Sequence, residues 1–340
     1  MNKLNKPVIL VTGACGQIGT ELCAALRKKY GSSAVIATDR MAASGQMQRE
    51  GPYCQLDVLK KYDLEKRVMA SGVTQIYHLA AMLSATGEQQ PQQAWEVNMQ
   101  GLLHVLEVAR EQQVCQVFWP SSIAVFGEHA LPACCPQHSV TEPATIYGIS
   151  KHAGELWCKY YFDNYGLDVR SIRYPGLISH TAQPGGGTTD YAVDIFHQAL
   201  KTRTYTCFLK ESTTLPMLYM PDAIRATLEL MAAPAESLSV RTGYNLWGMS
   251  FSPKELAEQI CRYLPVFQIN YQPDARQRIA DSWPTGIDDR LARRDWGWKE
   301  QYDLPAMVAD MLYNLGDSDL KRVIGQGQKE KEAAFVGSPG

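Results

Sequence analysis

The first half of the chain alternates short, continuous apolar runs with longer stretches in which apolar residues recur every three or four positions. A continuous run such as residues 7–12 is typical of a strand buried on both faces of a parallel sheet. The periodic stretches predict helices that cover such a sheet. Six strands are predicted, at residues 7–12, 34–38, up to 58, 75–79, 116–119 and 168–174. The alternation predicts an α/β fold with a doubly wound, Rossmann-type parallel sheet.

The alternation weakens after Pro175, which indicates a smaller second region. Short strands are predicted at 204–209 and 244–247, and helices at 191–200, from 221 onward, at 253–263 and at 303–314. We expect a sheet domain over residues 1–175 and a mainly substrate-binding region over 176–323, with some return to the sheet. Residues 324–340 are polar and glycine-rich and are expected to form a disordered tail.

A glycine-rich turn follows the first predicted strand. Gly13, Gly16 and Gly19 lie between that strand and a helical pattern through Leu22 and Leu26. Their spacing is wider than Gly-x-Gly-x-x-Gly, but both patterns give a tight turn, a backbone close to a pyrophosphate and close helix-on-strand packing. A glycine-rich turn alone is often only a turn. The strand before it and the helix after it favour a nucleotide site.

The second predicted strand ends at Asp39, twenty residues after Gly19. A carboxylate there hydrogen-bonds the ribose hydroxyls of NAD and repels the 2′-phosphate of NADP. The alternative is a simple strand-end cap. NAD is therefore the predicted cofactor, although Arg40 comes next and has a side chain that accommodates a phosphate.

Further candidates follow other strands. Asp57 either faces the adenine amino group or caps the next helix. His78 is expected to be packed within its strand, and the residues 79–81 after it are small enough for ribose and phosphates to lie against the backbone. Asn98, on the helix that begins near Pro91, either contacts the cofactor or ties neighbouring loops together.

Tyr147 and Lys151 are four residues apart, on one face of a predicted helix. A phenol, with an ordinary pKa of about 10, is a poor base near neutral pH, but a neighbouring ammonium and a bound cationic nicotinamide favour the phenolate. Lowering the pKa to about 7 takes roughly 4 kcal/mol. Taken alone, such a pair is more often two residues on a solvated helix face.

Ser121 and Ser122 follow the fifth predicted strand, at the carboxyl edge where open α/β sheets bind ligands. A serine hydroxyl there hydrogen-bonds a substrate alcohol and passes its proton toward a base. Lone serines in such loops usually cap or turn, and the pattern does not separate the two. Their convergence with the tyrosine and lysine of the next helix predicts an alcohol-oxidising site.

A second glycine-rich stretch covers residues 184–190 and reads Pro-Gly-Gly-Gly-Thr-Thr-Asp before a predicted helix. Backbone N–H groups and threonine hydroxyls at a helix start suit a small anion such as a carboxylate. The alternative is a hinge loop in which Thr189 or Asp190 caps the helix.

Composition narrows the choice of partners. The 340 residues are 45% hydrophobic and 20% charged with a net charge of −2, so neither nucleic acid nor an anionic membrane is an expected partner. Nine scattered cysteines indicate reduced thiols, and the seven histidines fall at no metal-ligand spacing, so no metal is expected. No signal-peptide pattern or membrane-spanning run is visible, and a cytoplasmic location is expected.

Together these residues resemble the extended short-chain dehydrogenase/reductase superfamily, over residues 7 to about 314. The similarity covers Gly13-x-x-Gly16-x-x-Gly19, Asp39, residues 79–81, Asn98, residues 121–127 and Tyr147-x-x-x-Lys151. Within the superfamily, longer stretches are similar to the short-chain type of L-threonine 3-dehydrogenases. These stretches are 83–88, 119–123, 173–178, 184–191, 215–222 and 279–284.

The resemblance implies NAD-dependent oxidation of L-threonine to 2-amino-3-oxobutanoate, in threonine catabolism, by a homodimer built on helices that include the catalytic one. It implies that Tyr147 is the general base, that Lys151 holds the nicotinamide ribose and lowers the tyrosine pKa, and that Ser122, with Ser121 able to share the task, is the catalytic hydroxyl. Residues expected at the cofactor are Gly13, Gly16, Gln17, Ile18, Gly19, Asp39, Arg40, Asp57, Val58, Leu79, Ala80, Ala81, Asn98, Tyr147, Lys151 and Tyr174. Residues expected at the substrate are Ser84, Ser121, Ser122, Tyr147, Gly186, Thr188 and Thr189.

Three rival functions use parts of the same pattern. A nucleotide-sugar 4-epimerase holds NAD permanently and uses the same Ser/Tyr/Lys set, but residues 185–189 suit a small anion better. A 4,6-dehydratase needs an acidic pair beside the serine, where Ile123 and Ala124 stand. A non-catalytic NAD sensor is the alternative of another class; sensors often lack the tyrosine or lysine, and both are present here.

Overall fold

A seven-stranded parallel sheet organises the computed structural model, which describes residues 6–130, 133–181, 185 and 187–325. The strand order is β10-β6-β5-β4-β1-β2-β3, and every neighbouring pair is parallel. This confirms the predicted fold class. The strands are β1 (Ile9–Thr12), β2 (Val35–Asp39), β3 (Tyr53–Gln55), β4 (Gln75–His78), β5 (Gln116–Ser122), β6 (Asp168–Tyr174) and β10 (Tyr244–Asn245).

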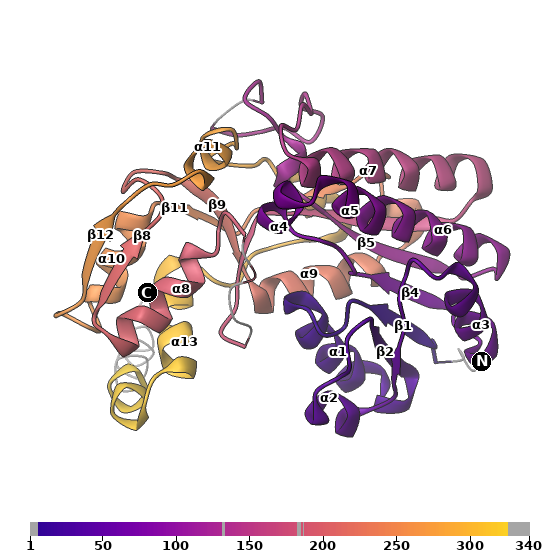
Figure 1. Cartoon of the computed structure of the whole chain (residues 1–340), viewed down its shortest axis with the longest axis horizontal. Coiled ribbons are helices and arrows are strands. Elements are labelled where there is room, and N and C mark those ends of the chain that lie inside the picture. The colour runs from indigo at the N-terminus through magenta and orange to yellow at the C-terminus, as the bar shows by residue number, and fades with distance from the viewer. Residues whose placement is uncertain (1–5, 131–132, 182–184, 186, 326–340) are drawn as a thin grey trace, which may run out of the picture.

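Helices cover both faces of this sheet (Figure 1). One face carries α3 (Lys61–Ser71), α6 (Gly101–Glu111) and α7 (Ile146–Tyr165), and the other carries α1 (Gln17–Tyr30), α2 (Gly45–Glu50) and α9 (Met220–Ala232). Successive β1 residues pack into different cores: Ile9 and Val11 into one and Leu10 into the other. All three are fully buried, which explains the continuous apolar run.

The third strand ends earlier than predicted. β3 stops at Gln55, so the predicted end at residue 58 was wrong. The Asp57 carboxylate accepts a hydrogen bond from the Leu59 N–H at 3.0 Å and turns the chain toward α3. A local side-chain bond of this kind competes with strand pairing. Leu56 and Val58 remain buried, but they pack beyond the strand.

The predicted long helix near Pro91 contains a π-helical segment. α5 (Pro91–Trp95) continues through Glu96–Gln100, which is π-helical, into α6. Asn98 lies in this segment and ties two elements together. Its amide oxygen accepts from the Met82 N–H at 2.7 Å, and its amide nitrogen donates to the Met82 carbonyl and to Ser150 Oγ. Asn98 therefore ties neighbouring segments together, as one of the two alternatives predicts, and its contact with the cofactor stays a prediction.

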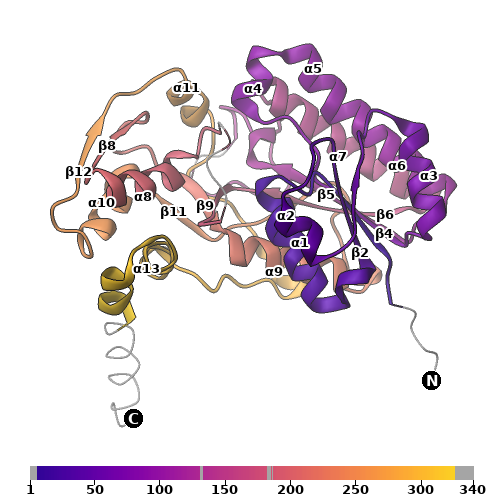
Figure 2. The same cartoon turned by 60° about the horizontal axis from the view of Figure 1, so that its bottom comes forward.

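The C-terminal region packs beside the sheet around its own apolar core (Figure 2). It contains a small sheet of β11 (Met249–Phe251), β9 (Leu215–Tyr219) and β7 (Gly176–Ile178), and a parallel pair of β12 (Gln268–Tyr271) with β8 (Thr204–Cys207). Its helices include α8 (Tyr191–Lys201), α10 (Pro253–Cys261), α11 (Arg276–Asp281) and α13 (Leu304–Leu315), whereas α12 (Arg290–Trp296) packs on β10 and the core of the main sheet. Between them, α9 and β10 return to the main sheet; the domain boundary at 175 stays a prediction.

Some predictions concern residues outside the described ranges. These are Gly186 and the tail beyond residue 325. Within the described ranges, no helix has the length and apolar character needed to cross a membrane. The same residues contain no cluster of three or more His, Cys, Asp or Glu side chains able to hold a metal ion.

Candidate active site

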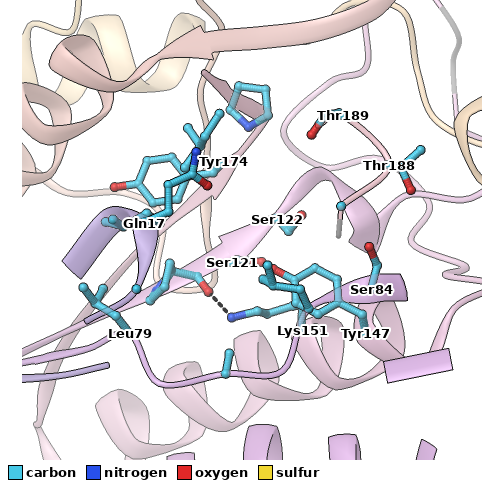
Figure 3. Close-up of a pocket in the computed structure, with 18 of the residues that line it drawn as sticks. Gln17, Leu79, Ser84, Ser121, Ser122, Tyr147, Lys151, Tyr174, Thr188 and Thr189 are labelled. Atoms are coloured by element: carbon cyan, nitrogen blue, oxygen red, sulfur yellow. Dashed lines mark hydrogen bonds between the residues drawn. The ribbon is translucent and has the colours of Figure 1, made fainter. Parts of the chain in front are cut away.

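A cavity of about 240 Å³ lies at the carboxyl edge of the main sheet, between the sheet and the C-terminal region (Figure 3). Most of the predicted site residues line it. They are Gly13, Gly16, Gln17, Ile18, Gly19, Leu79, Ala81, Ser84, Ser121, Ser122, Tyr147, Lys151, Tyr174, Thr188 and Thr189. Asp39, Arg40, Asp57, Val58, Ala80 and Asn98 are not part of its lining.

The glycine-rich turn is packed too tightly for side chains. Gly13 has a φ of +70°, and a Cβ there would lie 2.6 Å from the Ala80 nitrogen. A Cβ on Gly19 would lie 2.2 Å from the Gly13 carbonyl oxygen. The turn therefore brings the start of α1 against the end of β4. Residues 16–19, at the start of α1, line the cavity, and a helix start is a place at which a pyrophosphate would be stabilised.

Asp39 lies at the end of β2, beside this turn. Its carboxylate accepts hydrogen bonds from the Cys15 and Met41 N–H groups, both at 3.1 Å. It therefore also caps the strand end, and carboxylate lone pairs remain for ribose hydroxyls. The adjacent Arg40 side chain is exposed to solvent.

Tyr147 and Lys151 project from the first turns of α7, as the spacing predicts. Thr145 caps the helix, because its Oγ1 accepts from the Gly148 N–H at 3.0 Å. Lys151 is 3% exposed; its Nζ donates to the Pro120 carbonyl at 2.6 Å and lies 5.5 Å from the centre of the Tyr147 ring. Ser122 is close enough to the Tyr147 hydroxyl to act against a rise in its pKa.

Burial dominates the electrostatics of this pair. Desolvation raises the pKa of Tyr147 to about 12, and the hydrogen bond with Ser122 opposes the rise. Desolvation also lowers the pKa of Lys151 to about 7, opposed by Cys158 and Glu155. Lys151 is not among the causes of the Tyr147 shift in the protein alone, and the expectation that it lowers the tyrosine pKa when the nicotinamide is bound stays a prediction. Burial disfavours the charged form of Lys151, and its Nζ is directed to the Pro120 carbonyl.

Ser121 and Ser122 end β5, and their hydroxyls have different partners. Ser121 Oγ donates to Glu155 Oε1 at 2.6 Å in a buried contact. Ser122 Oγ accepts from the Ala124 N–H at 3.2 Å and also interacts with Tyr147. The Ser121 hydroxyl is thus engaged by Glu155, while Ser122 is the serine that influences the pKa of Tyr147; which of the two is the catalytic hydroxyl stays a prediction.

Hydroxyl groups gather on the side of the cavity away from the glycine-rich turn (Figure 3). Ser84 and Thr188 are 6% and 2% exposed, and Thr188 Oγ1 has no hydrogen-bond partner among the described residues. A buried hydroxyl without a partner is unfavourable unless a ligand satisfies it. Asp190 closes the loop, since its carboxylate accepts from the Gly187 N–H at 2.7 Å.

Two aromatic side chains, His78 and Trp283, have different surroundings. His78 is buried as expected; its Nδ1 lies 2.8 Å from Thr12 Oγ1, and desolvation lowers its pKa to about 3. Trp283, in contrast, lines the cavity, although its residue type and periodicity do not single it out as a site residue. The sequence held one indication of this role: Trp283 lies in the stretch 279–284, which is similar to L-threonine 3-dehydrogenases. The periodicity of apolar residues gives no information on such a role.

The fold and this Ser/Tyr/Lys cavity are those of an extended short-chain dehydrogenase. Residues 9–246 match the NAD dependent epimerase/dehydratase family, and the chain belongs to that family. It is 47% identical to the mitochondrial L-threonine 3-dehydrogenase of Sus scrofa over 92% of this chain and 83% of the relative.

Solved structures give the same relationship. The holo form of a GalE-like L-threonine dehydrogenase from Cupriavidus necator superposes with a TM-score of 0.89 at 56% identity, covering 91% of this chain and all (100%) of that one. A UDP-glucose 4-epimerase from Thermotoga maritima has a TM-score of 0.78 at 19% identity, over 90% of this chain and 97% of that one. At that identity the likeness concerns the fold alone.

Proposed function

We propose that the protein oxidises the 3-hydroxyl of L-threonine to 2-amino-3-oxobutanoate with NAD⁺. The observation that carries the proposal is the cavity itself, in which a Tyr147–Ser122 pair faces buried hydroxyls suited to a small amino acid. Relatives named L-threonine 3-dehydrogenases, 47% and 56% identical over most of the chain, support the same substrate.

The residues present fit NAD. A Cβ on Gly13 or Gly19 would fill the turn on which the pyrophosphate rests, and Asp39 offers acceptors to the ribose. Gln17 and Ile18 begin α1 at the pyrophosphate, while Leu79, Ala81 and Tyr174 line the cavity between the turn and Lys151. When bound, NAD⁺ supplies the hydride acceptor, and its positive ring adds the charge that Tyr147 lacks in the protein alone.

The chain's own groups orient and deprotonate the substrate. Ser122 hydrogen-bonds the substrate hydroxyl, and Tyr147 takes its proton as general base. Lys151 holds the nicotinamide ribose with its Nζ. Ser84, Thr188 and Thr189 bind the carboxylate and ammonium, so a substrate with little apolar surface is held by preorganised hydrogen bonds.

Absorbance of newly formed NADH tests the proposal. We expect L-threonine to give NADH with added NAD⁺, and a UDP-sugar to give none. Interconversion of UDP-sugars without net NADH would instead identify an epimerase. Tight binding of NAD⁺ with no turnover on any alcohol would identify a sensor.

We also propose that the protein is a homodimer through α7. Ile149, Leu156, Trp157 and Tyr160 form an outward apolar stripe at helical spacing, and Leu156 is 53% exposed. One similar solved structure is described as a monomeric L-threonine 3-dehydrogenase, so the state needs measurement. Sedimentation should give a dimer, and Leu156→Lys a monomer.

A cytoplasmic location is the last part of the proposal. All nine cysteines are unpaired, which suits a reducing compartment, whereas two mammalian relatives are named as mitochondrial. Fractionation of the source cells would decide between the compartments.

A further inference from the structure

A fully buried ion pair lies directly behind the candidate catalytic strand end. Glu155 is 1% exposed and Arg173 is 5% exposed. Arg173 Nε donates to Glu155 Oε1 and Nη2 to Oε2, both at 2.7 Å. The same Oε1 accepts from Ser121 Oγ at 2.6 Å. One carboxylate of α7 therefore binds two neighbouring strands, because Ser121 of β5 pairs in register with Arg173 of β6.

The network leaves this carboxylate little freedom. Arg173 Nη1 donates to the Gln137 carbonyl at 2.9 Å and to Asn245 Oδ1 at 3.1 Å, so the guanidinium is fixed from its other side. A Cβ on Gly243 would lie 2.8 Å from Glu155 Oε1, which shows how closely the backbone covers it. A buried ion pair is seldom retained for stability alone, since apolar residues of similar volume often serve as well.

The spacing of three residues along α7 relates this ion-pair network to the candidate catalytic residues. Tyr147, Lys151 and Glu155 are four residues apart and share one helix face. Lys151 donates to the Pro120 carbonyl and Glu155 accepts from the Ser121 hydroxyl, while Tyr147 lies close enough to Ser122 for that serine to affect its pKa; Pro120, Ser121 and Ser122 are three successive residues of β5. The helix thus holds the strand end at consecutive points, and two of the three contacts lie outside the chemistry.

We propose that Glu155 and Ser121 are positioning residues for the oxidation. Side chains of successive strand residues point to opposite sides, so holding the Ser121 hydroxyl on Glu155 fixes the side on which Ser122 faces Tyr147. Without this contact the strand end can rotate, and the Ser122 hydroxyl leaves the substrate. The inference rests on the proposed dehydrogenase function, and it assigns Ser121 a role distinct from that of Ser122.

Ser121→Ala is the main kinetic test. We expect kcat to fall about tenfold, with KM for NAD⁺ and the Kd of NAD⁺ within twofold of wild type. Ser121→Thr keeps the hydroxyl and should recover most of kcat. Ser171→Ala is the matched control, because Ser171 is a buried serine of β6 whose hydroxyl has no partner among the described residues; its kcat should not change. A lower melting temperature for Ser121→Ala with unchanged kcat would overturn the proposal.

A double-mutant cycle separates action through Glu155 from independent effects. In the Glu155→Gln background, Ser121→Ala should lower kcat no further. Losses that multiply would show that the two side chains act separately and would overturn the proposal.

A crystal structure of Ser121→Ala decides the question without turnover. We expect the Ser122 hydroxyl to be turned away from Tyr147, and an unchanged Ser122 would contradict the proposal. If wild type formed no NADH from L-threonine while this displacement was seen, only the proposed function would fail.

Discussion

The two sides of the cavity are built by different means. On the cofactor side the structure depends on missing side chains: Gly13 and Gly19 let backbone segments approach to distances that a Cβ would prevent. On the catalytic side it depends on buried polar side chains, with Tyr147, Lys151 and Glu155 of α7 bound to the end of β5. An added side-chain atom in the glycine-rich turn therefore disturbs the cofactor side, whereas the loss of a hydrogen-bond or ion-pair partner disturbs the catalytic side.

This difference explains why the cofactor side depends mainly on backbone groups, with Asp39 at its edge, whereas the catalytic side depends on buried titratable side chains. A dinucleotide brings its own phosphates, so backbone N–H groups at the start of α1 suffice to bind it. A proton transfer needs side chains with a defined orientation and protonation state. Burying such a polar or charged side chain costs free energy unless it has a hydrogen-bond or ion-pair partner. The catalytic side is therefore expected to be the more sensitive of the two to single substitutions.

Glu155→Gln should have the largest effect on stability. It leaves the 5%-exposed Arg173 guanidinium without its counter-charge, so we expect a loss of about 3–5 kcal/mol in the free energy of unfolding, measured by urea denaturation. The matched control replaces both Glu155 and Arg173 with Met. It should regain most of the stability yet stay slow, and equal stability of the single and double variants would contradict the explanation.

Tyr147→Phe should abolish most of the catalytic activity without affecting the fold or the binding of NAD⁺. Loss of the general base should lower kcat at least a hundredfold, or about 2.7 kcal/mol, with NAD⁺ still bound. Tyr165→Phe, at the far end of the same helix and half exposed, is the control and should keep wild-type kcat. Activity of Tyr147→Phe within a few-fold of wild type would place the base elsewhere.

Gly19→Ala should break the cofactor side. The new Cβ would lie 2.2 Å from the Gly13 carbonyl oxygen, so the turn must move, and we expect the Kd of NAD⁺ to rise about tenfold, or 1.4 kcal/mol. Gly45→Ala is the control, because its Cβ would meet only the flexible Arg49 side chain, at 3.3 Å. Fluorescence titration measures both, and unaltered binding in Gly19→Ala would exclude this turn as the pyrophosphate site.

The stability of Lys151→Met relative to wild type should depend on pH, which tests the cost of burying charge on the catalytic side. Burial lowers the pKa of Lys151 from 10.5 to about 7, so the unfolded chain holds this proton more tightly than the folded protein does. The resulting penalty is full below pH 7 and vanishes above pH 10.5. We expect Lys151→Met to be inactive but more stable, by about 1 kcal/mol at pH 7.

Thermal denaturation between pH 6 and pH 10 tests this prediction. The advantage of Lys151→Met should shrink as pH rises. Lys159→Met on the same helix removes an exposed lysine and should show no such trend. A stability difference that does not change with pH would refute the assignment of the penalty to a buried charge.

The cofactor side could be predicted from the sequence because its determinants are local. Gly13, Gly16, Gly19 and Asp39 fall within 27 residues, and their spacing alone predicts a turn, a helix start and a strand end. Tyr147 and Lys151 were equally accessible, since one helical turn separates them. Each of these predictions rests on backbone geometry that neighbouring residues define.

What the sequence determined by itself was thus the sheet, the glycine-rich turn, the Tyr/Lys pair and the resemblance that implied a substrate. Only the tertiary structure placed Ser121 on Glu155, brought Trp283 to the cavity, and put the Tyr147 pKa above its ordinary value. The physical reason is that these properties depend on burial and on contacts between residues far apart in the chain. The periodicity of apolar residues predicts which face of a helix or strand is buried, but it does not predict which side chains of other elements contact that face.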